Sequence, residues 1–339
     1  MRNPTLLILI TLLSLLSCVE KIDLTKSSKQ LYLTIEGSIS NQTGPYYVNV
    51  SYATTEFKNE VFFSKPTPIY NAEVRVIDET NNKDFPFSFN PISERYENQD
   101  FAGTEGHVYR LDVQIGDQLY SSESVEMLPS VPLDSAYLIY NIETELMEIF
   151  IDVTDPASSK NFFRWTWSGH REALTLTAPV EEVSCDPPVV ECCSRCFVPI
   201  SGKNVKVLDD QLYSGSTFNK VKIGEFTILR PNGYLIEIQQ HNISDDAFDF
   251  WNSVSLQSES QGGLFDPPPF EIRGNIKNTS NPNQVVLGYF TVSGSDRKLI
   301  QFSGRPYSIN RYTYDRVCDD CRWIPLADTA KPKNWIDAN

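Results

Sequence analysis

The sequence is short of positive charge. Its 29 lysines and arginines stand against 44 aspartates and glutamates, which leaves a formal net charge of −15 over 339 residues. Proteins that bind nucleic acid neutralise phosphates with clustered lysine and arginine side chains, and the sequence has no such basic stripe. We therefore exclude nucleic acid as an expected partner. An acidic surface would keep the protein soluble and away from anionic lipid headgroups.

The sequence motifs of the common enzyme classes are also missing. There is no HExxH, no GxSxG, no P-loop and no dinucleotide-binding glycine fingerprint. The only three histidines, His107, His170 and His241, are widely separated along the chain. Asp152 and Asp155 are close in sequence, but their spacing matches no standard calcium loop. We predict no catalytic residue, no cofactor and no metal site, so we expect the chain not to be an enzyme.

Long hydrophobic runs are absent except at the N-terminus. Arg2 and an apolar run occupy the first 17 residues, and Cys18 follows a small residue. This is the pattern of a bacterial lipoprotein signal, and the run is too short to span a bilayer comfortably. We predict a signal peptide over residues 1–17, a lipidated Cys18, a polar tether over residues 18–29 and no membrane-spanning segment after it. Several acyl chains on Cys18 would anchor the protein stably to a membrane.

Cysteine is present in a number that suits an exported protein. Of the seven cysteines, one is expected to carry lipid, which leaves Cys185, Cys192, Cys193, Cys196, Cys318 and Cys321. An even number of thiols in an oxidising compartment favours disulfides, whose connectivity the sequence leaves open. The CxxC pairs at 193–196 and 318–321 make a zinc site the alternative, although they lie far apart in the chain.

Alternation of apolar and polar residues predicts β-strands along most of the chain. The alternation is clearest over residues 109–115, and Gly116 and Asp117 supply a hairpin turn after them. Strands at this spacing, with no helical period between them, predict an antiparallel sandwich. The stretch from NAEVRVID to GHVYRLDVQIGDQLYSSESVEM is similar to the prealbumin-like or immunoglobulin-like modules of exported proteins. We assign this first β-sandwich to residues 30–128.

A second β-rich sandwich domain is predicted over residues 129–325. Two prolines at 129 and 132 stiffen the connector between the domains. The aromatic-rich strand Phe162–Trp167 is expected to carry much of the second core. The segment Val285–Val292 is apolar on both faces, so we expect it to be a central strand.

One inserted α-helix is predicted in this mainly β chain, over about residues 245–260. Ser244 is a suitable N-cap, and the two aspartates after it place negative charge in the first turn. Residues 326–339 are predicted to form a C-terminal tail.

The segment QGGLFDPPPFEIRGNI after this helix has an unusual composition. Its prolines fix an extended backbone, and its two glycines let the chain leave the helix sharply. Two interpretations stay open: the apolar side chains fill the seam between helix and sheet, or they form a rigid lip that docks a partner or a ligand. The candidate lip consists of Leu264, Phe265, Pro267, Pro268, Pro269 and Phe270.

The order of these segments resembles a known family. ISDDAFDFWNSVSLQSES runs into QGGLFDPPPFEIRGNI and then NPNQVVLGYFTVSG, and the chain also carries CVEKIDL, GSIS, DPASSKNFFRW, CDDCR and KPKNW. These segments are similar to the Bacteroidota lipoprotein family catalogued as domain of unknown function 4249. Members of that family look like outer-membrane lipoproteins, often encoded beside TonB-dependent transporters. The family has no established activity or binding residues.

The resemblance implies a lipid-anchored protein of the outer membrane, exposed at the cell surface, with a TonB-dependent transporter as its partner. We accordingly expect a non-enzymatic accessory subunit, a binding protein or a lid, of a TonB-dependent uptake system. A structural or adhesive surface protein is the alternative. A hydrolase is the third hypothesis, because carboxylates are abundant enough to supply a catalytic pair.

Overall fold

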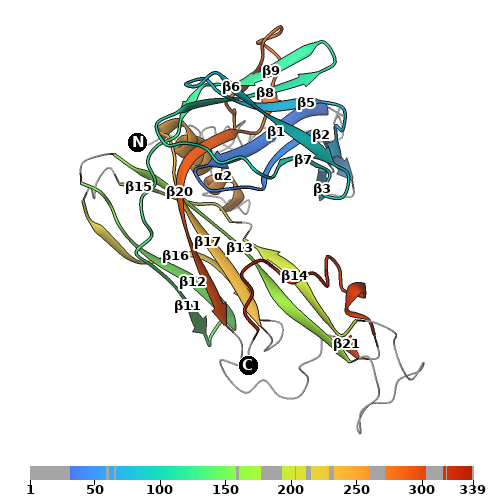
Figure 1. The fold of residues 1–339 in the computed structure, drawn as a ribbon, viewed down its shortest axis with the longest axis vertical. Helices are drawn as coiled ribbons and strands as arrows, with labels where there is room; N and C mark the ends of the chain where they lie inside the picture. The colour runs from blue at the N-terminus through green and yellow to red at the C-terminus, as the bar shows by residue number, and fades with distance from the viewer. Residues whose placement is uncertain are drawn as a thin grey trace, which may run out of the picture.

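The computed structural model describes residues 31–58, 61–64, 66–157, 160–176, 193–202, 204–210, 215–228, 233–259, 272–302, 316–317 and 319–337. These residues form two β-sandwiches, which lie one above the other in Figure 1. The mainly β fold class expected from the sequence is confirmed. In the described part of the chain, no helix has the length and the apolar character needed to cross a membrane.

The first sandwich consists of two sheets. In one sheet β1 (Leu31–Ser40) lies between β2 (Tyr46–Lys58) and the pair β19 (Val286–Leu287) and β20 (Phe290–Phe302). β2 also pairs with β3 (Val61–Ser64), β4 (Thr67–Pro68) and β7 (Arg95–Asn98). The other sheet contains, in order, β6 (Lys83–Asn90), β5 (Glu73–Asp78), β8 (Val108–Ile115), β9 (Gln118–Ser122) and β18 (Ile276–Asn278). Beside β8 lies β10 (Val125–Glu126), and β6 joins the two sheets through β7.

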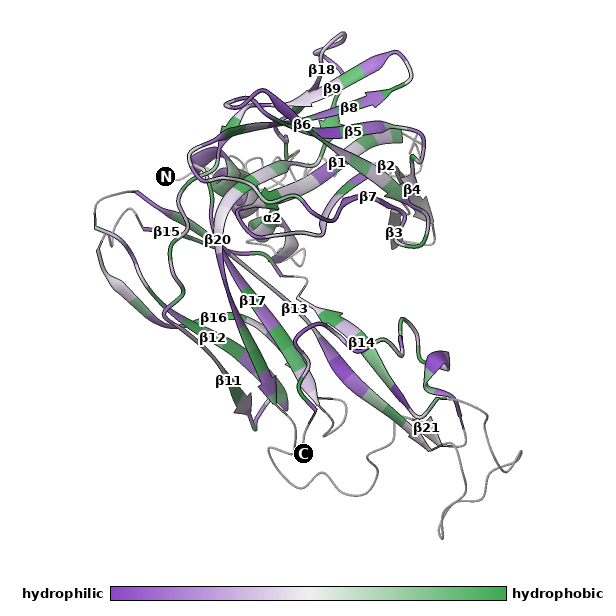
Figure 2. Ribbon diagram, in the orientation of Figure 1, coloured by the Kyte–Doolittle hydropathy of each residue, from purple (hydrophilic) through white to green (hydrophobic). Residues whose placement is uncertain are grey.

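Alternation determines which side chains of these strands enter the first core. On β1, Leu33, Ile35 and Ile39 are at most 2% exposed, while the alternate residues Thr34, Glu36 and Ser38 are less buried. On β8, Leu111 and Val113 are completely buried. Figure 2 shows the hydrophobic and hydrophilic residues following one another along these strands. Each fully buried aliphatic side chain stabilises the fold by about 1.5–3 kcal/mol.

The second sandwich also has two sheets. One is three-stranded, with β12 (Leu146–Thr154) between β11 (Ser135–Asn141) and β16 (Thr217–Thr227). In the facing sheet β13 (Phe162–Leu176) pairs on one side with β17 (Tyr234–Asn242), which pairs with β20. On its other side β13 pairs with β14 (Arg195–Ser201) and β15 (Lys206–Asp209), and its end pairs with β21 (Arg316–Val317). The two sheets enclose a core that includes Phe163 and Trp165, as the aromatic-rich strand predicted.

β20 belongs to both sandwiches. Its first residues, from Phe290 to Ser293, run parallel to β1, and from Gly294 onward it pairs antiparallel with β17. β18 and β19 also pair within the first sandwich, and Ile276 and Val286 lie in its core. The structure therefore adds residues 276–293 to the first sandwich, although the range predicted for the second domain, 129–325, contains them.

The prediction of a central strand over Val285–Val292 is wrong. Gly288 separates β19 from β20 with a φ of +95°, and a Cβ there would lie 2.1 Å from the carbonyl oxygen of Ile35. Among the described strands of the first sandwich, residues 290–293 pair with β1 alone. Tyr289 and Thr291 of this segment contact a helix on the face opposite the first core, so both faces of the segment are covered.

That covering helix is α2 (Asp245–Glu259), which confirms the predicted helix. Ser244 caps it, since its Oγ accepts a hydrogen bond of 3.3 Å from the backbone N–H of Ala247. Ala247 and Trp251 are buried, and the indole N–H of Trp251 donates to Thr291 Oγ1 on β20 at 3.2 Å. The helix thus lies against the junction of the two sandwiches, as Figure 1 shows.

The C-terminal segment docks on the second sandwich. Cys196 on β14 forms a disulfide with Cys321 in the short 3-10 helix η1 (Cys321–Trp323). Further along, Trp335 is 6% exposed and packs edge-on against Phe197, with ring centroids 4.8 Å apart. The residues predicted as a tail, 326–339, therefore include a segment that is held against β14.

Candidate functional site

A pocket of about 750 Å³ lies between the two sandwiches. Its floor is the face of β13, β17 and β20 that points away from the second core, and its opposite wall is β1 with the loop into β2. The C-terminal segment contributes Pro332, Lys333 and Asn334 to one side. Small-molecule sites in proteins commonly have volumes of about 300–1,000 Å³ and often lie between domains.

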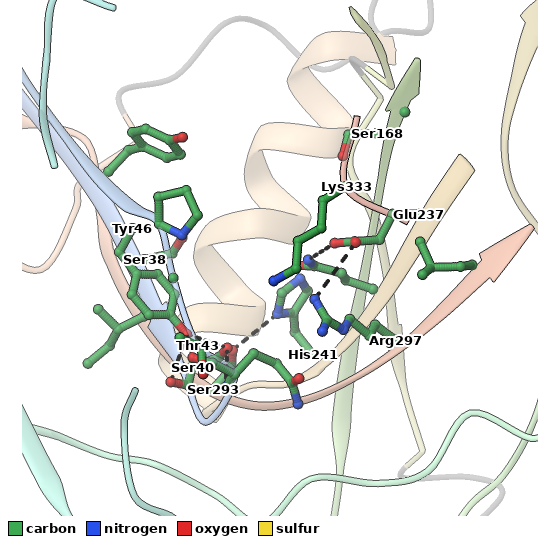
Figure 3. Close-up of a pocket in the computed structure, with 18 of the residues that line it drawn as sticks. Ser38, Ser40, Thr43, Tyr46, Ser168, Glu237, His241, Ser293, Arg297 and Lys333 are labelled. Carbon is green, nitrogen blue, oxygen red and sulfur yellow. Dashed lines mark hydrogen bonds and ion pairs between the residues drawn. The ribbon is translucent and has the colours of Figure 1, made fainter. Parts of the chain in front are cut away.

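The composition of the floor follows from strand alternation. In β13 every second residue from Phe163 enters the second core, so Arg164, Ser168 and His170 face the pocket. In the register of the sheet Arg164 lies opposite His241 of β17, and Gln239 of β17 lies opposite Arg297 of β20. The floor is therefore mainly polar, with Leu235 and Leu299 as apolar members, and lies on the face of the sheet opposite the second core. Figure 3 shows His241, Glu237 and Arg297 on this side of the pocket.

The opposite wall carries hydroxyl groups and is fixed to the floor by hydrogen bonds. Asn41 Oδ1 accepts from the backbone N–H of Ser295 at 2.8 Å, and Gln42 Nε2 donates to the carbonyl oxygen of Ser295 at 2.9 Å. Tyr46 hydrogen-bonds to Ser40 Oγ at 2.9 Å. Figure 3 shows Ser40 and Tyr46 with Ser38 and Thr43 across the pocket from the floor. These bonds from the loop to β20 hold the pocket open in one shape.

Arg164 is a partly buried cation of the pocket lining, whereas Lys333 is exposed. Its Nε atom is inaccessible to water and has no hydrogen-bond partner among the described residues, although part of the side chain reaches the pocket surface. Its guanidinium lies over the ring of Trp251 at 3.7 Å. Burial lowers the pKa of Arg164 to about 10, while the carboxylate of Glu36 favours the charged form. Arg164 is therefore still charged at neutral pH.

His241 is a neutral hydrogen-bonding residue. Burial, and then the charge of Arg164, lower the pKa of His241 to about 3. Its two ring nitrogens hydrogen-bond to Thr166 Oγ1 at 3.0 Å and to Ser293 Oγ at 3.2 Å. Burial also lowers the pKa of the half-buried His170. The imidazoles of the floor therefore add polarity without positive charge.

The rim carries further charges. Arg297 lies 3.9 Å from Glu237, a long ion pair in which both side chains are partly exposed. Lys333 is exposed and makes no hydrogen bond or ion pair with any described residue. In Figure 3 its ammonium group points into the pocket. With Arg164 these groups give the described lining three cations and one carboxylate.

A second, smaller pocket of about 320 Å³ lies between α2 and the first sandwich. It is lined by the acidic residues Glu123, Asp246 and Asp249, and by Arg273 and Tyr289. Burial is the largest cause that raises the pKa of Tyr289, to about 12, so its hydroxyl stays protonated at neutral pH. Residues 272–275, which include Arg273, belong to the segment QGGLFDPPPFEIRGNI and come after its three prolines.

The described lining of the larger pocket is poor in carboxylates. Glu237 is the only carboxylate among its described lining residues, so this lining offers no pair of carboxylates for glycoside hydrolysis. In the part of the chain that the structure describes, no group of three or more His, Cys, Asp or Glu side chains gathers to hold a metal ion. Asp152 accepts a hydrogen bond from Ser135 Oγ at 2.6 Å, and Asp155 accepts one from Asn161 Nδ2 at 2.8 Å.

The predicted site residues fall into two groups. Cys196 and Cys321 are bonded to each other, which confirms the disulfide interpretation for this pair, and Cys193 is disulfide-bonded as well. The remaining candidates lie outside the described residues: Cys18, Cys185, Cys192, Cys318, Leu264, Phe265, Pro267, Pro268, Pro269 and Phe270. For these the lipidation, the remaining disulfides and the two interpretations of the lip stay predictions.

The residues of the larger pocket were not singled out from the sequence as a site. One signal was present, because Arg164 interrupts the aromatic strand FFRWTW at a position that alternation directs away from the core. His241 and Arg297 lie on other strands, and only the pairing of β13, β17 and β20 brings them together. No local pattern places Lys333 beside them.

Comparison with known proteins identifies a family but no function. A family model described as a domain of unknown function (DUF4249) matches residues 19–298. No curated protein matches the sequence. One solved chain, from work on manganese lipoxygenase of Gaeumannomyces graminis and zonadhesin of Komagataella pastoris, is similar over 63% of this chain and 89% of its own length. The identity is 12% and the TM-score 0.17, so this likeness carries no argument.

Proposed function

Because this chain belongs to the DUF4249 family of unknown function, its role has to be inferred from its own residues. We propose that it is a lipid-anchored protein of the outer membrane, exposed at the cell surface. In this proposal it binds a small molecule without changing it chemically and acts as an accessory subunit of a TonB-dependent uptake system.

The pocket between the sandwiches is the observation that carries the proposal. It has the volume of a small-molecule site, lies between two domains and is held in shape by the bonds from Asn41 and Gln42 to β20. A preformed site binds with a smaller entropy cost than one that must be ordered first. The predicted lipid on Cys18 would hold this site beside a membrane partner.

The test uses the native organism and the full-length tagged protein solubilised from outer membranes. We expect affinity purification to recover a TonB-dependent transporter, and deletion of the gene to reduce uptake of that transporter's substrate. The matched control carries Cys18→Ala behind an ordinary cleavable secretory signal in place of residues 1–17: it should leave the membrane fraction and abolish recovery of the transporter, while both sandwiches stay folded.

Failure to recover any transporter, together with unchanged uptake in the deletion strain, would contradict the proposal. A loss of attachment or of envelope integrity that depends on no nutrient would favour a structural or adhesive protein instead. Release of a cleavage product from a bound ligand would favour the hydrolase.

A further inference from the structure

We propose that the pocket between the two sandwiches binds a small organic anion, with a carboxylate or phosphate group against Arg164 and with Arg297 and Lys333 at the rim. This inference rests on the proposed binding function and names the chemical class of the ligand.

The first argument is the state of Arg164. A guanidinium has five N–H donors, and taking it out of water is costly unless an anion or hydrogen-bond acceptors replace the water. Arg164 makes no hydrogen bond and no ion pair with any described residue, and its Nε is buried without a partner. The carboxylate of Glu36 acts on it only through its electric field. The Arg164 side chain is thus fixed in position while its N–H groups have no hydrogen-bond acceptor among the described residues.

The second argument is how Arg164 is held. Its guanidinium lies 3.7 Å from the centroid of the Trp251 ring, and the indole of Trp251 is fixed by its hydrogen bond to Thr291. Stacking on an aromatic ring orients the planar guanidinium and leaves its N–H edges available for a carboxylate or a phosphate. An arginine oriented in advance in this way suits bidentate recognition of a planar or tetrahedral oxyanion.

The third argument is charge. The chain carries a formal net charge of −15, yet the described lining of this pocket holds Arg164, Arg297 and Lys333 against Glu237 alone. A concave site with an excess of positive charge attracts ligands of opposite charge. Such a site in an acidic protein selects anions that the rest of the surface repels.

The fourth argument is the neutral polar lining. Ser38, Thr43 and Ser168 line the pocket with hydroxyl groups, and His241 supplies polarity without charge. These groups suit the hydroxyl or amide groups of an organic ligand, which a bare inorganic ion lacks. The lining therefore fits an anion attached to a polar organic body.

The test compares anionic ligands with a neutral one, and glucose 6-phosphate and glucose are the matched pair. The protein used is the chain from residue 18 onward, purified with Cys18→Ala so that it carries no lipid. It is titrated by calorimetry with glucose 6-phosphate, citrate and inorganic phosphate, and with glucose as the neutral control. We expect glucose 6-phosphate and citrate to bind more tightly than glucose, and their affinity to fall as salt is added. Arg164→Gln should weaken anion binding about ten- to hundredfold, because a charge-assisted hydrogen bond to a buried group is lost.

The control variant is Arg110→Gln, which removes an arginine on the first sandwich that is paired with Glu79 at 2.8 Å, outside the pocket. It should leave anion affinity unchanged. Arg164→Lys keeps the positive charge without the planar guanidinium, and it should recover part of the affinity that Arg164→Gln loses. This partial rescue is not expected if Arg164 only packs against Trp251. Thermal unfolding of each variant confirms that it is folded.

Two results would overturn the inference: no anion binds the wild-type protein, or Arg164→Gln binds anions as tightly as wild type does. If glucose binds and the anions do not, the ligand is not an anion and this inference is wrong, whereas the proposed binding function is still supported. Anion binding by a protein that recovers no transporter would support the inference and contradict the proposed uptake role.

Discussion

Arg164 and His241 lie opposite each other on β13 and β17, so two basic side chains share one partly buried patch. A second positive charge beside Arg164 would be costly in these surroundings, and the low pKa of His241 avoids it. The neutral imidazole can hydrogen-bond to both Thr166 and Ser293. One cation, and not two, therefore faces the pocket from this pair of positions.

His241 should make the stability of the protein depend on pH. Its pKa is lowered from 6.5 to about 3 in the folded state, so below pH 6.5 the unfolded chain takes up a proton that the folded chain does not. The unfolding free energy should therefore fall as the pH is lowered from about 6.5 toward 3, with a limiting slope of about 1.4 kcal/mol per pH unit for one proton. At higher pH this contribution is constant.

The measurement is urea unfolding of wild type and of His241→Gln between pH 7 and pH 4. The difference between their unfolding free energies should change with pH in this direction, because the glutamine does not titrate. Parallel curves would show that His241 takes up its proton equally well in the folded and the unfolded chain.

At the scale of elements, α2 holds the junction of the sandwiches together. Its buried Trp251 donates a hydrogen bond to Thr291 on β20 and stacks on Arg164 of β13, so the helix contacts two of the three strands of the pocket floor. The helix begins at Ser244, whose backbone oxygen also accepts from Phe248 at 2.9 Å. Any fraying of its first turn would loosen the support of Arg164.

Ser244→Ala should lower the unfolding free energy by about 1 kcal/mol, because the alanine cannot accept the hydrogen bond from the first turn of the helix. Chemical denaturation measures this loss. Ser258→Ala, at an exposed position in the last turn, is the control and should change stability by about 0.5 kcal/mol or less. Equal losses for the two variants would show that Ser244 does not cap the helix.

At the scale of the whole molecule, the two sandwiches share the strand β20. β20 pairs with β1 in the first sandwich and with β17 in the second, and Phe290 and Val292 enter the first core. The first sandwich is therefore incomplete without residues that come more than a hundred positions after its predicted end. This shared strand also keeps the two walls of the pocket at a fixed distance.

A fragment of residues 31–128 should fail to fold on its own. It lacks β18, β19 and β20, so the core residues that pack against Ile276, Val286, Phe290 and Val292 would be exposed to water. Far-ultraviolet circular dichroism during heating should show no cooperative transition for the fragment and one for the full soluble chain. A cooperative transition in the fragment would show that the first core is sufficient without these strands.

Part of this protein could be predicted from local patterns. The alternation over residues 109–115 indicated which face of β8 is apolar, the aromatic residues of Phe162–Trp167 indicated a core strand, and the cap at Ser244 indicated where the helix begins. These signals depend on residues a few positions apart, so a single sequence is enough to carry them. Alternation within FFRWTW also directs Arg164 to the face away from the core, but it does not specify what that face contacts.

The sequence by itself determined a mainly β chain with one capped helix, an apolar face on each strand, and a cysteine set suited to disulfides. Only the tertiary structure decided that residues 276–293 return to the first sandwich and that Arg164, His241 and Arg297 border one pocket. The bond that fixes the pocket wall joins Asn41 to Ser295, which are 254 positions apart. Alternation specifies the face of a strand and not its partner, and the partner depends on how all strands pack together.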